Sequence, residues 1–307
     1  MEKNSKLDSS ETRPVMPLVS IGVPVYNGAA TLERVLDSLL RQSLVDFELI
    51  ISDNNSNDGT AAICQAFADR DVRVRYIRQV QNLGAVFNFQ YVMDQARGRY
   101  FLWAACDDVR TLDFLEENVR FLENNPDYVA SASPNCFEGE PPVGANFISF
   151  SIAAPTIHDR FHLFFQNCWE SHGIFYSVVR TEVLKKCELF GQSFAAADWA
   201  FNLFLASQGN IHRCDKGLTI FGLNGVSSRS GSYRAFRTRR IELLLPFYRL
   251  SLYVLKLSAQ FPLREKFKIL RALFKINMRA SWGQAYSALY QLYCAHLKPK
   301  RKLTHLE

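Results

Sequence analysis

The sequence predicts an α/β protein in which a mostly parallel sheet carries helices on both faces. Apolar segments of strand length alternate with segments of helical periodicity through the first half of the 307-residue chain, an order typical of parallel sheets. Several of the apolar segments end in polar residues, and residues 101–108 end in two adjacent carboxylates. The 48% hydrophobic content supports a substantial core and excludes a disordered or fibrous protein.

The first half of the chain contains four strand-to-helix crossings. The helix at residues 31–40 has apolar residues at i, i+3, i+4, i+7 and i+8, with Thr31 as a candidate cap. In chain order, the predicted elements are a strand at 19–25, the helix at 31–40, a strand at 47–52, a helix from 60 to about 69, a strand at 74–77, a helix opened by 82–84 that ends at 96, and a strand from 99. Because parallel strands share one carboxyl edge, Tyr26, Asp53 and Asp107 are expected to lie together there.

The second half is less regular until residue 172. The predicted elements are a helix at 111–124, a strand at 128–132, a loop with two consecutive prolines at 135–144, a strand at 173–180, a short helix at 181–187 and an apolar helix at 193–206. A single carboxylate, Asp198, interrupts the start of that apolar helix. A charge in such a context needs a functional reason.

Charge is distributed unevenly along the chain. The net charge is +6, yet residues 230–307 hold 16 Lys and Arg against 3 Asp and Glu, which leaves 20 against 27 for residues 1–229. The basic end predicts contact with an anionic surface. Its longest apolar window, residues 241–259, is interrupted by Pro and charges, so it fits an amphipathic helix in the membrane surface better than a membrane span. The basic face of that helix continues through Arg264, Lys266, Lys268, Arg271 and Lys275.

Cysteine usage and the amino-terminal residues bear on location. The seven cysteines form no Cys-x-x-Cys pair or metal-ligand spacing, which favours a reducing cytoplasm. Residues 1–16 lack the apolar core of a signal peptide and are expected to be a mobile tail. The expected location is therefore cytoplasmic, peripheral on the inner face of the plasma membrane. Nucleic acid is the lesser alternative as an anionic partner, because no recognised binding motif accompanies the charge.

Short motifs at residues 23–27, 53–60, 82–84, 106–108 and 198–199 follow one another along residues 17–230. In this order they resemble those of a family 2 glycosyltransferase of the GT-A fold. Residues 23–27 resemble the opening strand of the family, and residues 53–60 resemble its Asp-Asp-x-Ser-x-Asp-Gly-Thr loop. Asn82-Leu83-Gly84 resembles the Asn-x-Gly of the family, and Cys106-Asp107-Asp108 resembles the end of its Asp-x-Asp-Asp element. Asp198-Trp199 falls where the family keeps its catalytic base. The resemblance implies a GT-A domain at 17–230, and the charge pattern predicts a helical, membrane-associating segment at 231–307.

The resemblance implies transfer of one sugar from a nucleotide donor with inversion at the anomeric carbon. An Asp that accepts a hydrogen bond from a ring N–H favours uracil or thymine, so the expected donor is a UDP- or dTDP-sugar and the expected acceptor a lipid-linked or cell-surface glycan. Asp107 would hold Mg²⁺ or Mn²⁺ against the phosphates, and Asp198 would deprotonate the acceptor hydroxyl. The implied donor-binding residues are Pro24, Tyr26, Asn27, Asp53, Asn82 and Asp107.

Several residues keep two interpretations. Asp108 is either a second metal ligand or a helix cap, Asp58 is more consistent with an N-cap than with a ligand contact, and Trp103 favours the core over a sugar platform. Trp199 and His172 are candidates for the acceptor side or for structural roles.

The chain departs from the family pattern at three places. Ala105 replaces the first Asp of the metal element, and the Gln-x-x-Arg-Trp signature of processive synthases is missing, which favours single-sugar transfer. The His that relatives often carry near the end of the domain is also missing, which leaves Arg229 or Arg234 to contact diphosphate. Ala105 keeps open a catalytically silent nucleotide-sugar-binding or membrane scaffold module. A nucleotidylyltransferase is a further alternative, but its Gly-rich loop is missing after the first strand.

Overall fold

The computed structural model describes residues 16–140, 150–189, 192–223 and 236–296. Its central feature is a seven-stranded sheet in which all neighbouring pairs are parallel except those made by β8. The strands lie in the order β3 (Val74–Arg78), β2 (Phe47–Asp53), β1 (Val19–Val25), β4 (Tyr100–Trp103), β8 (Val178–Arg180), β6 (Tyr128–Ala132) and β9 (Asn210–Arg213). The predicted mostly parallel sheet is confirmed.

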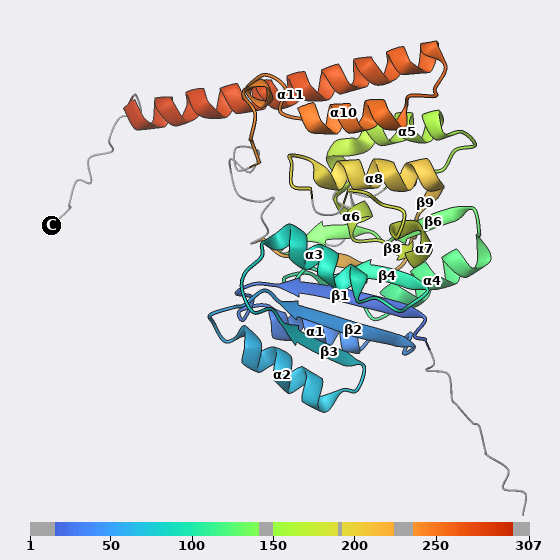
Figure 1. Cartoon of the computed structure of the whole chain (residues 1–307), viewed down its shortest axis with the longest axis vertical. Helices are drawn as coiled ribbons and strands as arrows, with labels where there is room; N and C mark the ends of the chain where they lie inside the picture. The colour runs from blue at the N-terminus through green and yellow to red at the C-terminus, as the bar shows by residue number, and fades with distance from the viewer. Residues whose placement is uncertain (1–15, 141–149, 190–191, 224–235, 297–307) are drawn as a thin grey trace, which may run out of the picture.

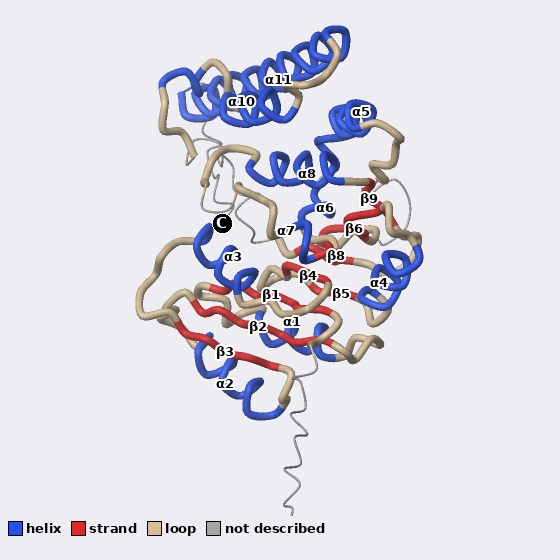
Figure 2. Tube along the Cα trace, turned by 45° about the vertical axis from the view of Figure 1, so that its right-hand side comes forward, coloured by secondary structure: helices blue, strands red, loops and turns tan. Residues whose placement is uncertain are grey.

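Helices cover both faces of this sheet, as predicted (Figures 1 and 2). One face packs against α1 (Leu32–Leu40), α2 (Thr60–Arg70) and α4 (Phe114–Asn124). The other packs against α3 (Ala85–Asp94), α5 (Ile157–Asn167) and α8 (Ala197–Gln208). Strand β4 divides its side chains between the two cores, because Leu102 points to the first and Phe101 and Trp103 to the second. Trp103 is fully buried and confirms the core assignment.

A second, three-stranded sheet lies beside the carboxyl end of β4. It consists of β5 (Val109–Arg110), β10 (Thr219–Phe221) and β7 (Asn135–Phe137), with β10 in the middle. A loop was predicted where β7 forms, which was wrong, and no element was predicted at β5. Strands of two or three residues are too short to show a periodic pattern.

Two other predicted elements differ from the structure. Residues 173–180 were expected as one strand, but His172–Phe175 is the short helix α6 and only β8 is extended. The apolar helix expected from residue 193 begins at Ala197. Both apolar runs lie in the larger core, where burial on all sides removes the polar alternation that would distinguish strand from helix. The predicted short helix is α7 (Thr181–Leu184).

The chain ends in two helices that lie beyond α5 and α8 (Figure 1). These are α10 (Tyr248–Leu257), preceded by the 3₁₀ turn η3 (Arg240–Leu243), and the long helix α11 (Leu263–His296). Asn277 of α11 accepts a hydrogen bond from the backbone N–H of Phe247 and donates one to Ser251, which fixes α10 against α11. In the described part of the chain, no helix has both the length and the apolar composition needed to cross a membrane.

Candidate functional site

The carboxyl ends of β1, β2 and β4 meet at one edge of the sheet. Val25 pairs with Asp53 across β1 and β2, and Gly22 pairs with Trp103 across β1 and β4. The loops that follow these strands therefore start side by side and carry Tyr26, the residues after Asp53 and the Asp107-Asp108 pair. The predicted common edge is confirmed, and it is where ligands bind in open α/β sheets.

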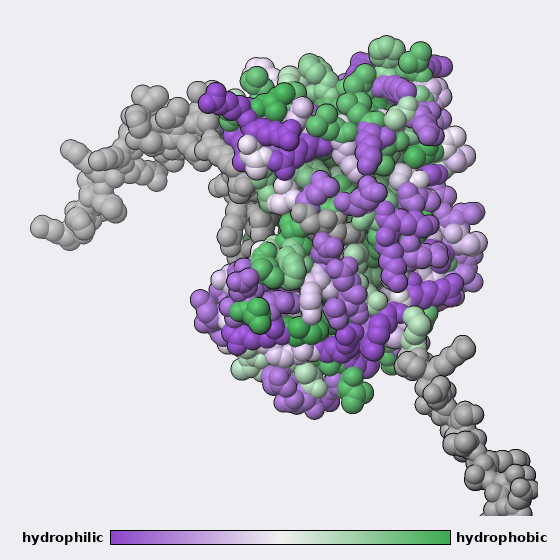
Figure 3. Space-filling model, in the orientation of Figure 1, coloured by the Kyte–Doolittle hydropathy of each residue, from purple (hydrophilic) through white to green (hydrophobic). Residues whose placement is uncertain are grey.

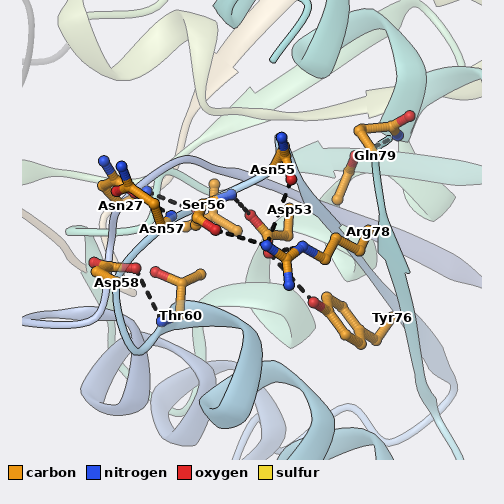
Figure 4. Close-up of polar contacts among 12 residues, drawn as sticks. Asn27, Asp53, Asn55, Ser56, Asn57, Asp58, Thr60, Tyr76, Arg78 and Gln79 are labelled. Atoms are coloured by element: carbon orange, nitrogen blue, oxygen red, sulfur yellow. Dashed lines mark hydrogen bonds and ion pairs between the residues drawn. The ribbon is translucent and has the colours of Figure 1, made fainter. Parts of the chain in front are cut away.

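Asp53 is completely buried at the end of β2. Its Oδ1 accepts the backbone N–H of Ser56 at 2.8 Å, and its Oδ2 accepts the hydroxyl of Tyr76 at 3.3 Å. Arg78 lies alongside, with its Nε 3.7 Å from Oδ2 (Figure 4). These contacts hold the loop of Asp53 in place, and its carboxylate has no exposed surface in this structure. Sequence reasoning missed Arg78, which lies one strand away.

The loop after β1 is tied to the loop after β2 by main-chain donors (Figure 4). Asn27 has a positive φ of 53°, a conformation that Asn tolerates better than most residues. Its N–H donates to the hydroxyl of Ser56, and its Oδ1 accepts the N–H of Asn57. Tyr26, the residue before Asn27, keeps 47% of its surface exposed. It follows Val25, which pairs with Asp53 across β1 and β2, so an accessible aromatic residue lies at this edge of the sheet, while Pro24 is buried in β1.

Asp58 lies one residue before the N-cap position of α2, which Gly59 occupies, so the predicted N-cap assignment is wrong by one residue, although Asp58 still binds the start of that helix. Its Oδ1 accepts the N–H of Thr60, the first residue of α2, and its Oδ2 accepts the N–H of Ala29. The hydroxyl of Thr31, in contrast, donates to the carbonyl oxygen of Cys106 at 2.7 Å and makes no capping hydrogen bond. Thr31 therefore occupies the predicted N-cap position of α1, but its side chain joins the helix to the loop of the acidic pair and does not cap the helix.

Two buried asparagines that were not predicted as site residues hold together the loops at the carboxyl edge of the sheet. Asn54 donates to Asn82 at 2.9 Å and accepts the N–H of Leu83, which joins the loop after β2 to the turn before α3. Asn88 of α3 donates to the carbonyl oxygens of Val25 and Ser52. An Asn inside an otherwise apolar helix was the available signal for Asn88, since buried polar side chains need partners.

The two carboxylates after β4 have different surroundings. Asp107 is half-buried, and burial raises its pKa, while the cation of Arg34 acts in the opposite direction. Asp108 is buried and accepts the N–H of Gly222 at 3.1 Å; burial raises its pKa to about 6. Asp113, five residues on, occupies the N-cap position of α4. The interpretation of Asp108 as the cap of that helix was therefore wrong.

Gly222 closes directly over the acidic pair. A Cβ atom at this position would lie 2.6 Å from Oδ2 of Asp107, closer than any real contact. Only glycine therefore allows β10 to pass this close to the carboxylate. Gly222 was not predicted as a site residue, because a contact across more than 100 residues leaves no local pattern.

Charged side chains extend the site beyond the predicted set. Arg34 of α1 forms an ion pair with Glu138, which follows β7, and the charges of both act on Asp107. Close to the Asp107-Asp108 pair, Arg110 is buried and donates to the carbonyl oxygen of Trp103. Its Nε and Nη1 have no hydrogen-bond partner among the described residues. Asp108 counteracts the lowering of the Arg110 pKa that burial causes. A buried cation thus partly offsets the acidic pair.

Tyr176 connects the acidic pair electrostatically to Asp198. Burial raises the pKa of the Tyr176 hydroxyl, and the charges of Asp108, Asp107 and Asp198 raise it further. Asp198 is exposed in the first turn of α8. The N-cap residue Ala196 has a φ of 63°, an uncommon conformation for a residue with a Cβ. The chain therefore makes a sharp turn into α8, and the carboxylate next to that turn remains accessible.

The acceptor-side candidates have mixed outcomes. Trp199 is 7% exposed and packs edge-to-face against Trp169 and Phe164, so it belongs to the larger core. His172 begins α6, but its side chain lies outside the described part of the structure. Arg229 and Arg234, the candidates for diphosphate, also lie outside the described residues.

The carboxylate oxygens available here suit a cation that is held jointly by the protein and a phosphate ligand. They suit a cation held by protein ligands alone less well. Asp107 supplies an accessible carboxylate, Ala105 supplies none, and Asp108 is already bonded to Gly222. No group of three or more His, Cys, Asp or Glu with metal-binding geometry occurs within the described residues. Mg²⁺ in phosphate-handling sites is held by one or two carboxylates plus substrate phosphates, and Asp107 fits that arrangement.

Comparison with known proteins supports a single assignment. The family model described as "Glycosyl transferase family 2" matches residues 20–179, more than half of the chain. A segment of 106 residues is 35% identical to "Putative teichuronic acid biosynthesis glycosyltransferase TuaG" of Bacillus subtilis and covers 34% of this chain and 42% of that protein. A segment of 111 residues is 39% identical to "Uncharacterized glycosyltransferase EpsJ" of the same organism and covers 36% and 32%. The matched segments thus span less than half the length of these relatives.

The fold has solved counterparts. The S. aureus protein TarS, residues 1–349, in complex with UDP-GlcNAc, superposes with a TM-score of 0.56 over 83% of this chain and 79% of that one, at 15% identity. The same TarS fragment without that ligand gives a TM-score of 0.55. These likenesses show a GT-A fold. The family match and the motif-bearing carboxyl edge within it lead to one conclusion: the chain belongs to glycosyl transferase family 2.

Proposed function

We propose that this glycosyltransferase moves a single sugar from a UDP- or dTDP-sugar to a lipid-linked or cell-surface glycan, with inversion at the anomeric carbon. The observation that supports the proposal most is the carboxyl edge of the sheet, where Asp53, Asp107 and Asn82 lie at or after the ends of neighbouring strands. Hydrogen bonds hold Asp53 and Asn82 within their loops, and Asp108, next to Asp107, accepts the N–H of Gly222. TarS binds UDP-GlcNAc on a similar fold, which is consistent with a uracil donor.

The donor would lie across this edge. The exposed ring of Tyr26 offers a surface for the base, and Asp53, which is buried in this structure, would accept from a ring N–H. Asn27 and Asn82 border the same loops. The phosphates would then reach Asp107, where a bound Mg²⁺ or Mn²⁺ would supply Lewis-acid stabilisation of the leaving nucleoside diphosphate.

Asp198 would act as the general base. Its carboxylate takes the proton of the acceptor hydroxyl while that oxygen bonds to the anomeric carbon, and the bond from this carbon to the phosphate oxygen breaks. The electron pair leaves with the nucleoside diphosphate, and attack from the opposite face inverts the configuration. The exposure of Asp198 in the first turn of α8 supports this role.

The decisive experiment measures donor binding and transfer separately. A thermal-shift panel of nucleoside diphosphates and their sugars, with and without Mn²⁺, should give the largest stabilisation with a uridine or thymidine donor. With that donor and a lipid-linked acceptor, Asp198→Asn should lower turnover by roughly 10²–10⁴ and leave donor binding unchanged. Asp215→Asn, an exposed carboxylate outside the site, is the matched control. Wild-type turnover by Asp198→Asn would remove Asp198 from the mechanism.

A catalytically silent nucleotide-sugar-binding or scaffold module is the second candidate, and Ala105 in the metal element is the observation that favours it. It predicts donor binding without hydrolysis or transfer across an acceptor panel. Transfer that depends on Asp198 contradicts it.

A further inference from the structure

The outer surface of α11 carries an apolar stripe that no described residue covers. Leu263, Phe267, Leu270 and Phe274 follow a spacing of four, three and four residues and so share one side of the helix. Their exposed fractions are 74%, 69%, 45% and 62%. Figure 3 shows hydrophobic surface over this part of the molecule, at the top of the view. A contiguous exposed stripe of this kind marks an interaction surface.

The stripe is separate from the side of α11 that packs on the protein. Ile269, Leu273, Ile276 and Ala280 are at most 7% exposed and belong to the core shared with α5 and α8. At 100° per residue, these buried positions centre about 115° away from the stripe. The core therefore does not need the exposed leucines and phenylalanines for packing.

Cations line the other border of the stripe. Arg264, Arg271 and Lys275 fall about 100° around the helix from it, and these three form no ion pair within the described part of the chain. Residues 297–307 add four more Lys and Arg to the sequence. Apolar side chains bordered by unpaired cations are the arrangement by which amphipathic helices lie in an anionic membrane surface.

The geometry points to an anionic lipid bilayer as the occupant of this surface, with Phe267 and Phe274 entering the boundary between headgroups and acyl chains and Arg264, Arg271 and Lys275 contacting lipid phosphates. Binding to the bilayer would bring the proposed enzyme to a lipid-linked acceptor, which lies at such a surface. In this respect the inference rests on the proposed function. A second copy of the chain would bring the same cations against one another across a symmetric interface, at an electrostatic cost.

Vesicle flotation of the full chain tests the inference directly. Wild-type protein should float with vesicles of phosphatidylcholine that contain about 30% phosphatidylglycerol and should bind pure phosphatidylcholine far less. Phe267→Gln with Phe274→Gln should weaken binding at least about tenfold, because two partly exposed aromatic rings no longer enter the bilayer. Val45→Gln with Val72→Gln, two exposed apolar residues elsewhere, is the matched control and should float like wild type.

A second set of variants tests the charge. Arg264→Gln, Arg271→Gln and Lys275→Gln together should weaken binding to the anionic vesicles on the order of 100-fold. Arg41→Gln, Lys185→Gln and Lys186→Gln remove three exposed cations outside α10 and α11 and should have a much smaller effect. All variants should keep the thermal-shift response of wild type to UDP, which reports on the proposed function independently of lipid.

Three results would overturn the inference. The first is wild type that binds no vesicles, and the second is flotation that both α11 variants retain. The third is a wild-type dimer, seen by light scattering, that is lost in the Phe267 and Phe274 variant while wild type binds no vesicles. Loss of the UDP response with intact flotation would instead overturn the proposed function and leave the lipid surface in place.

Discussion

At the scale of single residues, the position of Asp107 depends on the absence of a side chain at Gly222. Gly222→Ala would place a methyl group 2.6 Å from Oδ2 of Asp107, so the carboxylate must move. We expect turnover to fall on the order of 100-fold, with little change in thermal stability because the contact lies at a sheet edge. Gly283→Ala is the control, since a Cβ there meets nothing within 4 Å. Unchanged turnover in Gly222→Ala would separate Asp107 from catalysis.

Ala105 determines how tightly this site can hold a cation. Ala105→Asp would restore a carboxylate that the family usually has, next to the accessible Asp107. Because cation affinity rises with ligand charge, we expect Mn²⁺ to bind on the order of tenfold more tightly in the presence of UDP. Isothermal titration calorimetry measures this without reference to activity, and Ala105→Asn supplies the neutral control. Equal Mn²⁺ affinity in wild type and Ala105→Asp would place the cation away from residue 105.

Prediction of individual residues succeeded where a strand end fixes the position. Asp53 and Asp107 follow buried strands, so the pattern placed them at one edge before any contact was known. Asn54, Arg78 and Gly222 escaped because their roles arise from contacts with other segments of the chain. Such contacts depend on how the loops pack, which no local periodicity encodes.

At the scale of elements, the helices of the first half were predictable because each has one more buried and one more exposed side. Strands β1 and β2 are buried throughout and were predictable as short apolar runs that end in polar residues. Helix α1, with Leu32, Val35, Leu36 and Leu39 buried, matches its predicted range within one residue. The short strand β5 and the helix α6 gave no such signal. Burial on all sides, as in the larger core, removes the contrast on which the prediction depends.

The junction between α5 and α11 should respond to acid. Glu265 accepts from Lys268 at 2.9 Å and contacts Nε2 of His162 at 2.7 Å, and these contacts lower its pKa from 4.5 to about 2. Because the folded pKa is depressed, the stabilisation is present above pH 4.5 and is lost as the pH falls towards about 2. The difference in free energy of unfolding between wild type and Glu265→Gln should therefore shrink over that interval in acid titrations followed by circular dichroism. A constant difference would contradict the role of Glu265 charge.

At the scale of the whole molecule, the proposed ligand-binding loops and a stabilising charge cluster lie at opposite edges of one sheet. The ligand loops follow the carboxyl ends of β1, β2 and β4, whereas a buried charge cluster lies at the amino ends of β1 and β2. There Glu48 accepts from Ser20, Arg75 and Arg97. The parallel topology that the strand and helix order predicts is the reason for this separation, because it brings all loops of one kind to one edge.

This separation predicts a variant that loses stability but keeps its chemistry. Glu48→Gln removes the charge that pairs with Arg75 and Arg97 and should lower the free energy of unfolding by about 2 kcal/mol, a modest loss because both arginines stay partly hydrated. Glu188→Gln, in an ion pair whose side chains are 74% and 83% exposed, should change stability within error. Urea unfolding measures both, and kcat measured well below the unfolding transition should match wild type. A fall in kcat for Glu48→Gln under those conditions would mean that the amino edge of the sheet is coupled to the donor loops.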